Sequence, residues 1–378
     1  MTKESWNYHN PVEIHFGNGI FKNLSDFVAS RKSALITTPG FTKRGTSGLL
    51  KHMLGDSLEA IFDDVNPNPT FVSVKAAFRN LQPYKYDTII ALGGGSTIDT
   101  AKAVAAIGAS GSEDWIDNHL KRGTPFSEPF NSQPVIAIPT TAGTGSEVTM
   151  WATIWDMEEK KKYSLSHPML YPRIAILDPE LTLTLPGKET IYTGLDALSH
   201  AMEAIWNKNH NPVSDTFALK AISLVHSYLP ELRNNLTSLD MRAFLLRASL
   251  FAGLAFSNTK TALAHSISYP LTAHFNIPHG LACALPLPHI LRFNGKRAAK
   301  RIGIMAEALG MNQTFESMAS EIMRLFERLG ISPHLADYGI NSGNRELISR
   351  SAFTPGRADN NIVEISHRDL VGMIELLF

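Results

Sequence analysis

Two patterns of apolar residues divide the chain near residue 186. Before that point, short apolar runs rich in β-branched residues alternate with segments of helical spacing. The apolar runs predict five strands, at residues 12–17, 33–38, 87–94, 134–140 and 173–179. Strands that alternate with helices are typical of a parallel sheet whose strands are joined by crossover helices.

After residue 186 the apolar residues follow a helical period. They repeat at intervals of three and four, as at Ile191, Leu195, Leu198, Met202 and Ile205. Residues 187–330 show no strand pattern, and a last helix is predicted for 367–378. We therefore predict an α/β domain with a parallel sheet at 1–186 and an all-α domain at 187–378.

Composition narrows the classes of partner. The 378 residues include 35 Lys+Arg and 35 Asp+Glu, so the formal net charge is zero. This balance favours neither nucleic acid nor an anionic membrane as a partner. The single cysteine, Cys283, excludes an internal disulfide and agrees with a reducing compartment. The first residues lack the apolar segment of a signal peptide, and no apolar run approaches the length of about 18 that a membrane helix needs. We expect a cytoplasmic protein.

A glycine-rich turn follows the third predicted strand, in DTIIALGGGSTIDTAKAVAA (87–106). Three glycines let a ligand approach the main chain closely, and the free N–H groups of a helix starting near Ser96 suit a pyrophosphate. The alternative is an ordinary strand-to-helix connection, capped by Ser96, in which Asp99 opposes the helix dipole. This segment alone does not decide between the two, because it lacks the G-x-G-x-x-G fingerprint.

A second polar loop follows the next strand, in VIAIPTTAGTGSEVT (135–149). Its hydroxyl groups and glycines suit a phosphate or a ribose, and ligands of open α/β sheets bind at the carboxyl ends of strands. The alternative is an ordinary hydrophilic loop. Two such loops after two strands favour a dinucleotide.

Two segments of the helical half carry metal-binding side chains. In YTGLDALSHAMEAIWN (192–207), Asp196 and His200 are four residues apart and share one helix face. For this pair alone, an internal hydrogen bond is the better explanation. The segment AHSISYPLTAHFNIPHG (264–280) adds His265, after a run predicted to be helical, and His279, beside a turn. Pro270 is expected to end or kink that helical run.

One carboxylate and three imidazoles suit a divalent first-row ion such as Fe²⁺ or Zn²⁺. Mg²⁺ and Ca²⁺ prefer shells made only of oxygen.

The sequence resembles the iron-containing (group III) alcohol dehydrogenase family. The matching motifs are GGGSTIDTAKA, PTTAGTGSEVT, DALSHAMEA and HSISYPLTAHFNIPHG, in the order and spacing of that family. Agreement runs from about residue 14 to about residue 370. The resemblance implies an N-terminal α/β nucleotide domain, a C-terminal helical domain and an active site in the cleft between them. We also expect a homodimer.

The resemblance also implies roles for individual residues. It marks the metal ligands as Asp196, His200, His265 and His279, and leaves His274 outside the pattern. It implies a pyrophosphate site at Gly94, Gly95, Ser96 and Asp99. It implies a wall around the nicotinamide half of the cofactor at Thr140, Thr141, Thr144 and Thr149. Two further contacts with the cofactor are implied at Asn68 and Lys162.

Tyr269 departs from the family pattern. Many members carry a histidine four residues after the third ligand, often proposed to relay a proton, and here that position is Tyr269. A phenol has an ordinary pKa of about 10, against about 6.5 for an imidazole. We therefore expect Tyr269 to shape the substrate site or to donate a hydrogen bond rather than to act as an obligatory base.

Thr38 stands where NAD-specific relatives carry an aspartate at the end of the second strand. An acidic residue there binds the ribose 2′-hydroxyl and repels the 2′-phosphate of NADP. No carboxylate occurs between Arg31 and Gly55, and the basic pair Lys43 and Arg44 follows Thr38. We therefore expect NADP to be used at least as well as NAD. The alternative for the basic pair is a solvated start of a helix.

These features predict a metal-dependent, NAD(P)-linked dehydrogenase that acts on a small primary alcohol or aldehyde. The metal would polarise the substrate oxygen during hydride transfer. A phosphonoacetaldehyde reductase-like enzyme is an alternative, and it requires a cationic site. A dehydroquinate synthase-like lyase is disfavoured, because residues 260–290 contain no basic residue except Lys260 and four histidines. A non-catalytic dinucleotide-binding protein with a structural metal is a further alternative.

Overall fold

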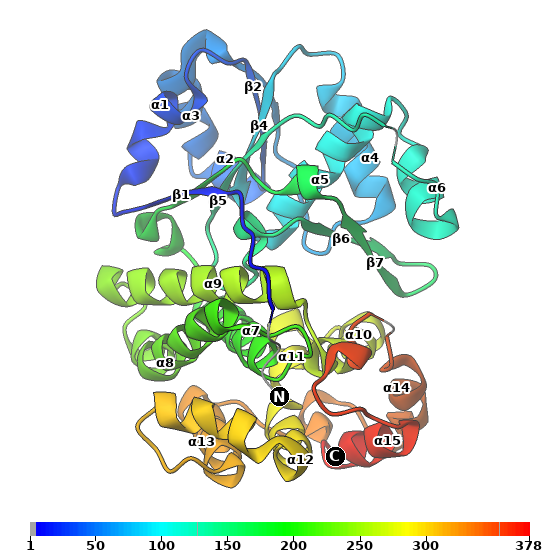
Figure 1. Cartoon of the computed structure of the whole chain (residues 1–378). Helices are drawn as coiled ribbons and strands as arrows, with labels where there is room; N and C mark the ends of the chain where they lie inside the picture. The colour runs from blue at the N-terminus through cyan, green and yellow to red at the C-terminus, as the bar shows by residue number, and fades with distance from the viewer. Residues whose placement is uncertain (1–4, 127, 355) are drawn as a thin grey trace. The chain divides into compact units, whose positions relative to one another are not determined.

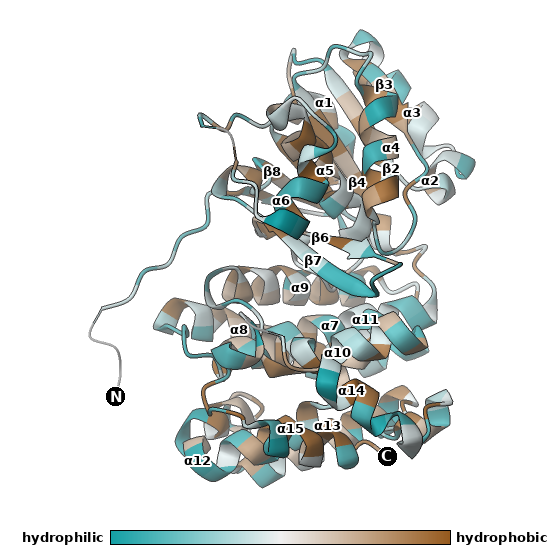
Figure 2. Ribbon diagram, turned by 90° about the vertical axis from the view of Figure 1, so that its right-hand side faces the viewer, coloured by the Kyte–Doolittle hydropathy of each residue, from teal (hydrophilic) through white to brown (hydrophobic). Residues whose placement is uncertain are grey.

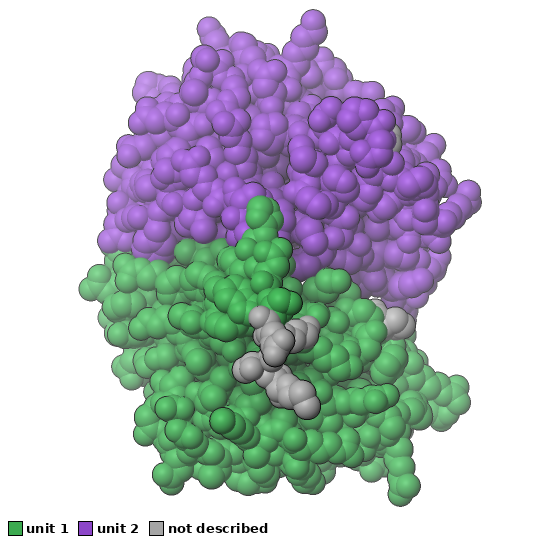
Figure 3. Space-filling model, in the orientation of Figure 1, with its two compact units in different colours: residues 1–9, 142–145, 183–378 green, residues 10–141, 146–182 purple. Residues whose placement is uncertain are grey.

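The computed structural model describes residues 5–126, 128–354 and 356–378. By its internal contacts the chain separates into two units, coloured in Figure 3. The first, called the sheet unit below, consists of residues 10–141 and 146–182. The second, called the helical unit, contains residues 183–378, the segment 142–145 and the N-terminal residues through His9. The domain ranges 1–186 and 187–378 stay predictions.

The sheet unit is built on six parallel strands, of which Figure 1 labels β1, β2, β4 and β5. In sheet order they are β1 (Glu13–Phe16), β8 (Ile174–Leu177), β5 (Val135–Pro139), β4 (Thr88–Gly93), β2 (Ser33–Thr37) and β3 (Leu58–Phe62). The five predicted strands correspond to β1, β2, β4, β5 and β8. The parallel sheet expected from the alternation of strands and helices is confirmed.

The sequence-based prediction missed three strands. One is β3, which alternates apolar residues with Glu59 and a half-buried Ile61 at the edge of the sheet. The other two form an antiparallel hairpin, β6 (Trp151–Asp156) and β7 (Lys161–Ser166). In β7, charged and hydroxyl residues hide the strand pattern, because only Leu165 is fully buried.

Helices cover both faces of the parallel sheet. They are α1 (Leu24–Val28), α2 (Pro39–Lys43), α3 (Thr46–Leu54), α4 (Phe71–Leu81), α5 (Gly95–Ser110) and α6 (Trp115–Arg122). Because successive strand residues point to opposite faces, Ala34 and Ile36 pack with α4 and α5, whereas Leu35 packs with α1, α2 and α3. Both faces are buried, so the central strands are apolar at most positions (Figure 2).

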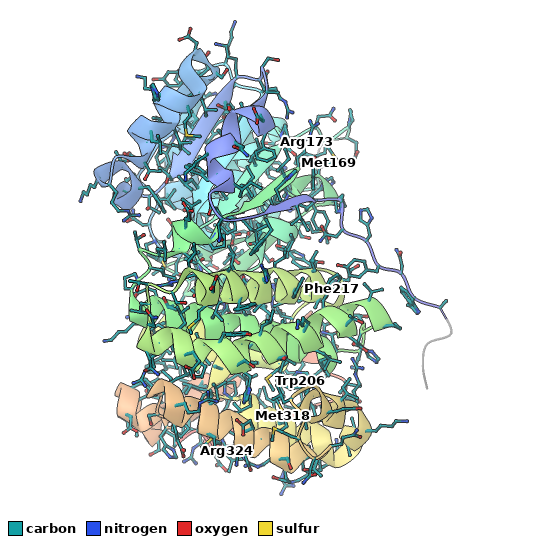
Figure 4. All side chains as sticks on the ribbon, turned by 90° about the vertical axis from the view of Figure 1, so that its left-hand side faces the viewer. Met169, Arg173, Trp206, Phe217, Met318 and Arg324 are labelled. Atoms are coloured by element: carbon teal, nitrogen blue, oxygen red, sulfur yellow. The ribbon has the colours of Figure 1, made fainter. Side chains whose placement is uncertain are left out.

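The helical unit contains nine α-helices among its described residues. They are α7 (Gly187–Ile205), α8 (Pro212–Asn234), α9 (Leu239–Thr259), α10 (Leu263–Phe275), α11 (His279–Ala284), α12 (Leu287–Ala308), α13 (Phe315–Leu329), α14 (Arg345–Ser351) and α15 (His367–Glu375). The all-α prediction for this half is confirmed. Trp206 and Met318, labelled in Figure 4, are fully buried in this unit.

Helix α7 is the central helix of this unit, since it contacts α8, α9 and α11. Nearly all of its residues from Gly194 onward are buried, including the polar residues that the sequence analysis selected.

The prediction for the segment before His265 was wrong in one respect. Instead of one helical run, α9 ends at Thr259 and α10 begins at Leu263, with Lys260 at a positive φ of 67° between them. Helix α10 then continues through Pro270 to Phe275. Among the described residues, no helix combines the length and the apolar character that a bilayer crossing needs.

Candidate metal and cofactor sites

Three helices bring the predicted metal ligands together inside the helical unit. Helix α7 carries Asp196 and His200, α10 carries His265, and α11 begins with His279. The next residue, Gly280, explains how α11 comes so close to α7. A methyl group at Gly280 would lie 2.0 Å from the carbonyl oxygen of Tyr192, so only glycine fits there.

The four predicted ligands lie close together, with Asp196, His200 and His265 buried and His279 half-buried. Asp196 Oδ1 lies 3.6 Å from Nε2 of His265 and 3.9 Å from Nδ1 of His200. The rings of His200 and His265 are stacked with centroids 4.4 Å apart, and the rings of His265 and His279 lie 5.4 Å apart. Separations near 4 Å between donor atoms leave room for one ion, whose bonds to such ligands are about 2.0–2.2 Å long.

Unpaired donor atoms support the fit of a metal. Among the described residues, Asp196 Oδ1, His200 Nδ1 and His265 Nε2 are buried and have no hydrogen-bond partner. Buried polar atoms without a partner are costly, and several of them facing each other call for a ligand. A divalent cation satisfies all three, and this donor set suits Fe²⁺ or Zn²⁺.

Glu203 contacts the predicted ligand His265. It lies on α7, is fully buried, and its Oε2 is 2.6 Å from Nδ1 of His265. The sequence analysis did not select it. Glu203 could have been found from its position, one helical turn after His200 and two turns after Asp196.

Cys283 is a second residue that the sequence analysis missed as a site residue. Its sulfur and one donor atom each from Asp196, His265 and His279 all lie within 4.8 Å of one another, and this group of four does not include the predicted ligand His200. The sulfur is 3.8 Å from each ring nitrogen of His279, four residues earlier on α11. This spacing of four, between two residues that can both bind metals, was visible in the sequence.

Burial and neighbouring charges set the protonation of the cluster. Burial lowers the pKa of His200 to about 4, so its imidazole is neutral and can bind a metal. Burial alone would raise the pKa of Asp196, but the imidazoles of His200, His265 and His279 outweigh it and hold that pKa well below its usual range. Burial raises the pKa of the Cys283 thiol.

Tyr269 and His274 lie on α10 after His265. The ring of Tyr269 is 6.4 Å from that of His279, so the residue that replaces the family's histidine lies beside the cluster. His274 lies in the last turn of α10 and contacts Phe275, and it is not part of the metal-binding group.

Three neighbouring strands of the sheet unit end at the predicted cofactor residues. Strands β5, β4 and β2 are adjacent, and their register pairs Gly93 with Pro139 and Thr37 with Leu92. The residues that follow these strands, Thr140, Gly94 and Thr38, therefore lie along one edge of the sheet. This is the edge at which open α/β sheets bind their ligands.

The glycine turn contacts two of the other predicted segments. A methyl group at Gly94 would lie 3.3 Å from Oγ1 of Thr141, so the two polar loops meet at that point. Asn68, with a positive φ of 58°, donates its backbone N–H to Oγ of Ser96. Gly95 is the first residue of α5, so the free N–H groups at the start of this helix lie at the glycine turn.

Asp99 and Thr149 belong to a buried polar network next to this turn. The carboxylate of Asp99 accepts hydrogen bonds from Ser146 Oγ at 2.6 Å and from the backbone N–H of Thr153 at 2.9 Å. Lys102 donates to the carbonyls of Ser146, Thr149 and Trp151. Burial lowers the pKa of Lys102 to about 8. The network holds residues 146–153 against α5.

Two further predicted cofactor residues lie on β7 and in the segment 142–145. Lys162, on β7, has its ammonium 5.8 Å from the ring of Trp155. Thr144 belongs to the segment 142–145, which is part of the helical unit. In this segment the backbone of Gly143 is hydrogen-bonded to His200, and Gly145 packs against Gly253.

Thr38 has a basic neighbour. A methyl group at Gly40 would lie 3.7 Å from Oγ1 of Thr38 and 3.2 Å from Nη1 of Arg44, so both side chains lie beside Gly40. The guanidinium of Arg44 also lies over the ring of Phe41, 4.4 Å from its centroid. The turn after β2 thus brings Arg44 near Thr38, and both Lys43 and Arg44 are exposed.

Comparisons with known proteins show the family of the chain. Residues 11–179 match the family described as iron-containing alcohol dehydrogenase, and residues 190–378 match the C-terminal family of Fe-containing alcohol dehydrogenases. The chain is 32% identical to an NAD-dependent methanol dehydrogenase of Bacillus methanolicus, over 98% of this chain and 99% of that protein. It is 30% identical to an NADPH-dependent butanol dehydrogenase of Clostridium saccharobutylicum, over 97% of each chain.

The fold is also similar to that of a solved structure. A sulfoacetaldehyde reductase from Bifidobacterium kashiwanohense, in complex with NAD⁺, superimposes with a TM-score of 0.92 over 99% of both chains at 33% identity.

Proposed function

Because the chain belongs to the iron-containing alcohol dehydrogenase family, we propose that it is a metal-dependent, NAD(P)-linked reductase of a small aldehyde. The aldehyde, a hydride from NAD(P)H and a proton give a primary alcohol and NAD(P)⁺, and the reverse reaction oxidises the alcohol. The observation that carries the proposal is the buried group of Asp196, His200 and His265, whose unpaired donor atoms face one another among the described residues.

The metal that fits this group is Fe²⁺ or Zn²⁺. When bound, it acts as a Lewis acid that polarises the substrate oxygen. The protein would supply the ligands Asp196, His200, His265 and His279. Glu203 would keep the ring of His265 in one orientation and one tautomer through its hydrogen bond to Nδ1. The burial of these side chains excludes water, which strengthens electrostatic interactions at the reacting group.

The cofactor is proposed to bind at the edge of the sheet unit where β2, β4 and β5 end. The free N–H groups at the start of α5, with Gly94, Gly95 and Ser96, would hold the pyrophosphate. Thr140, Thr141, Thr149, Asn68 and Lys162 would contact the remainder, with Asp99 holding the loop that follows β5. The predicted cofactor contact of Thr144 stays a prediction.

NADPH is proposed to be used at least as well as NADH. Thr38 carries no charge that would repel a 2′-phosphate, and Arg44 supplies a guanidinium near it. Arginine suits phosphate because its planar group donates two parallel hydrogen bonds. The curated relatives include both an NAD-dependent and an NADPH-dependent enzyme, so the family alone leaves this choice open.

An aldehyde that carries an anionic group is a second candidate substrate. One structural neighbour is a sulfoacetaldehyde reductase, and a phosphonoacetaldehyde reductase-like activity is the alternative that the sequence suggested. A specific observation favours this candidate, namely the guanidinium of Arg357 against Tyr269. A homodimer and a cytoplasmic location also stay predictions.

A screen of aldehydes tests the proposed reaction. Protein reconstituted with Fe²⁺ or Zn²⁺ is assayed for oxidation of NADPH and NADH with propanal, lactaldehyde, sulfoacetaldehyde and phosphonoacetaldehyde. Turnover of at least one aldehyde, with the corresponding alcohol as product, is expected. Stoichiometric metal and bound cofactor without turnover of any aldehyde or alcohol would favour the non-catalytic alternative.

A further inference from the structure

A cationic side chain lies next to the candidate metal cluster. Nε of Arg357 donates a hydrogen bond to the phenol oxygen of Tyr269, and its guanidinium carbon is 5.7 Å from the centre of that ring. The ring of Tyr269 is in turn 6.4 Å from the ring of His279. A positive charge therefore lies two side chains away from a proposed metal ligand, and it is absent from the motifs that identified the family.

The segment that carries Arg357 is fixed on both sides. Before it, Oγ of Ser266 on α10 donates to the carbonyl of Ala352 and accepts from the backbone N–H of Thr354. Gly356 has a positive φ of 76°, a conformation that other residues adopt with strain.

The chain after Arg357 is held as firmly. Asn360 donates to the carbonyl of Thr261 at 2.9 Å, and Asn361 exchanges two side-chain hydrogen bonds with Asn294. The backbone N–H of Ile362 bonds to the carbonyl of Trp206 at 2.8 Å. Arg357 thus projects from a loop that is tied to the helices around the metal cluster.

Arg357 differs in its ion pairing from other arginines of the helical unit. No carboxylate among the described residues forms an ion pair with it, whereas Arg301, Arg324, Arg345 and Arg350 each pair with an aspartate or a glutamate in the same unit. The hydrogen bond to Tyr269 involves only Nε of Arg357. The two terminal nitrogens carry four further N–H groups in a planar fork, the geometry that recognises sulfonate, phosphonate or carboxylate oxygens.

We propose that Arg357 binds the anionic head group of the substrate, so that the preferred substrates are short aldehydes ending in a strong oxyanion such as a sulfonate or a phosphonate. This inference rests on the proposed function. During reduction, the carbonyl carbon gains the hydride of NAD(P)H and the carbonyl oxygen gains a proton. No bond of the head group changes. Arg357 is therefore a specificity-determining residue, and Tyr269 positions it.

The test compares a neutral and two anionic aldehydes of similar size. The kcat/KM values for propanal, sulfoacetaldehyde and phosphonoacetaldehyde are measured with the metal-reconstituted wild type, Arg357→Gln and Arg357→Lys. The matched control is Arg350→Gln, since Arg350 is an exposed arginine of α14 that pairs with Glu346. Ethanesulfonate, which cannot be reduced, serves as a competitive probe of head-group binding.

We expect Arg357→Gln to lower kcat/KM for the anionic aldehydes by roughly 10- to 100-fold, the range for loss of hydrogen bonds to a charged group. Its kcat/KM for propanal should change by less than about threefold, given that charge-assisted bonds are lost only with an anion. Inhibition by ethanesulfonate should weaken in parallel, Arg357→Lys should recover part of the loss, and Arg350→Gln should match the wild type. The ratio of the two anionic substrates shows which head group is preferred.

Two outcomes overturn different claims. If the wild type reduces propanal and Arg357→Gln affects all three aldehydes equally, Arg357 only supports the local structure and the inference is wrong. If the wild type, with full metal content, reduces none of the aldehydes with either cofactor, the proposed function itself is wrong.

Discussion

Glu203 holds His265 by two hydrogen bonds. Its Oε2 lies 2.6 Å from Nδ1 of the imidazole, and its Oε1 accepts the backbone N–H of the same residue at 3.1 Å. A carboxylate at Nδ1 favours a proton on that nitrogen, which would leave Nε2, 3.6 Å from Oδ1 of Asp196, to bind a metal. Metal-binding histidines are typically oriented in this manner.

Glu203→Gln should therefore weaken metal binding without removing any ligand. We expect the affinity for Zn²⁺ to fall by about 10- to 100-fold, the usual effect of losing such a partner. Competition with a chromophoric chelator measures it. The matched control is Glu321→Gln, because Glu321 makes a similar 2.7 Å contact with His226 on α8. Equal affinities for both variants and the wild type would show that Glu203 does not tune the site.

His200 and Cys283 are rival candidates for one ligand position. Nδ1 of His200 is buried without a partner, whereas the Cys283 sulfur already contacts His279. We therefore expect His200→Ala to lose most bound metal and Cys283→Ala to keep it. Metal analysis gives the occupancy, and the visible spectrum of the Co²⁺ protein reports directly on sulfur. A thiolate-to-cobalt charge-transfer band that vanishes in Cys283→Ala would instead make the cysteine a ligand.

The sequence predicted those parts of the molecule that depend on local pattern. Buried strands such as β4 and β5 are apolar at most positions, and the Asp196–His200 pair is in register on one helix. Residues whose role depends on tertiary contacts were missed. Glu203 and Cys283 acquire their neighbours only when α7, α10 and α11 come together. Arg357 is almost ninety residues from Tyr269 in the chain, and no spacing rule connects them.

The positions of two predicted cofactor residues, Thr144 and Asp99, differ from those expected from the sequence. Thr144 was grouped with Thr140 because both follow one strand, but the chain enters the helical unit between them. Asp99 was grouped with the phosphate-binding turn, whereas its carboxylate accepts hydrogen bonds from Ser146 and Thr153. In both cases the direction of the side chain or the path of the backbone was not visible in the sequence, and the contact with the cofactor stays a prediction.

Cofactor preference should depend on Thr38 and Arg44. The wild type is expected to have a kcat/KM for NADPH at least equal to that for NADH. Thr38→Asp should lower NADPH use selectively, because a carboxylate repels the 2′-phosphate, and Arg44→Gln should act in the same direction. Lys43→Gln, at the exposed neighbouring position, is the control. A wild-type preference for NADH above about tenfold, roughly 1.4 kcal/mol, would contradict this prediction.

Tyr269→Phe should keep a substantial part of kcat with propanal. The phenol oxygen already accepts a hydrogen bond from Arg357, which makes the hydroxyl a donor rather than a base. Single-turnover rates with NADPH isolate the chemical step. A loss of about a thousandfold, within the range for general acid–base catalysis, would instead assign proton transfer to this hydroxyl.

The dependence of turnover on metal tests the central claim most directly. Protein stripped by a chelator is titrated with Fe²⁺ or Zn²⁺ while bound metal and aldehyde-dependent NADPH oxidation are measured together, for the wild type, His265→Ala and His279→Ala. The account predicts that wild-type activity is lost on stripping and returns in proportion to the metal bound, up to one equivalent per chain. It also predicts that neither variant binds metal stoichiometrically. Full activity in metal-free protein, or stoichiometric metal in both variants, would contradict it.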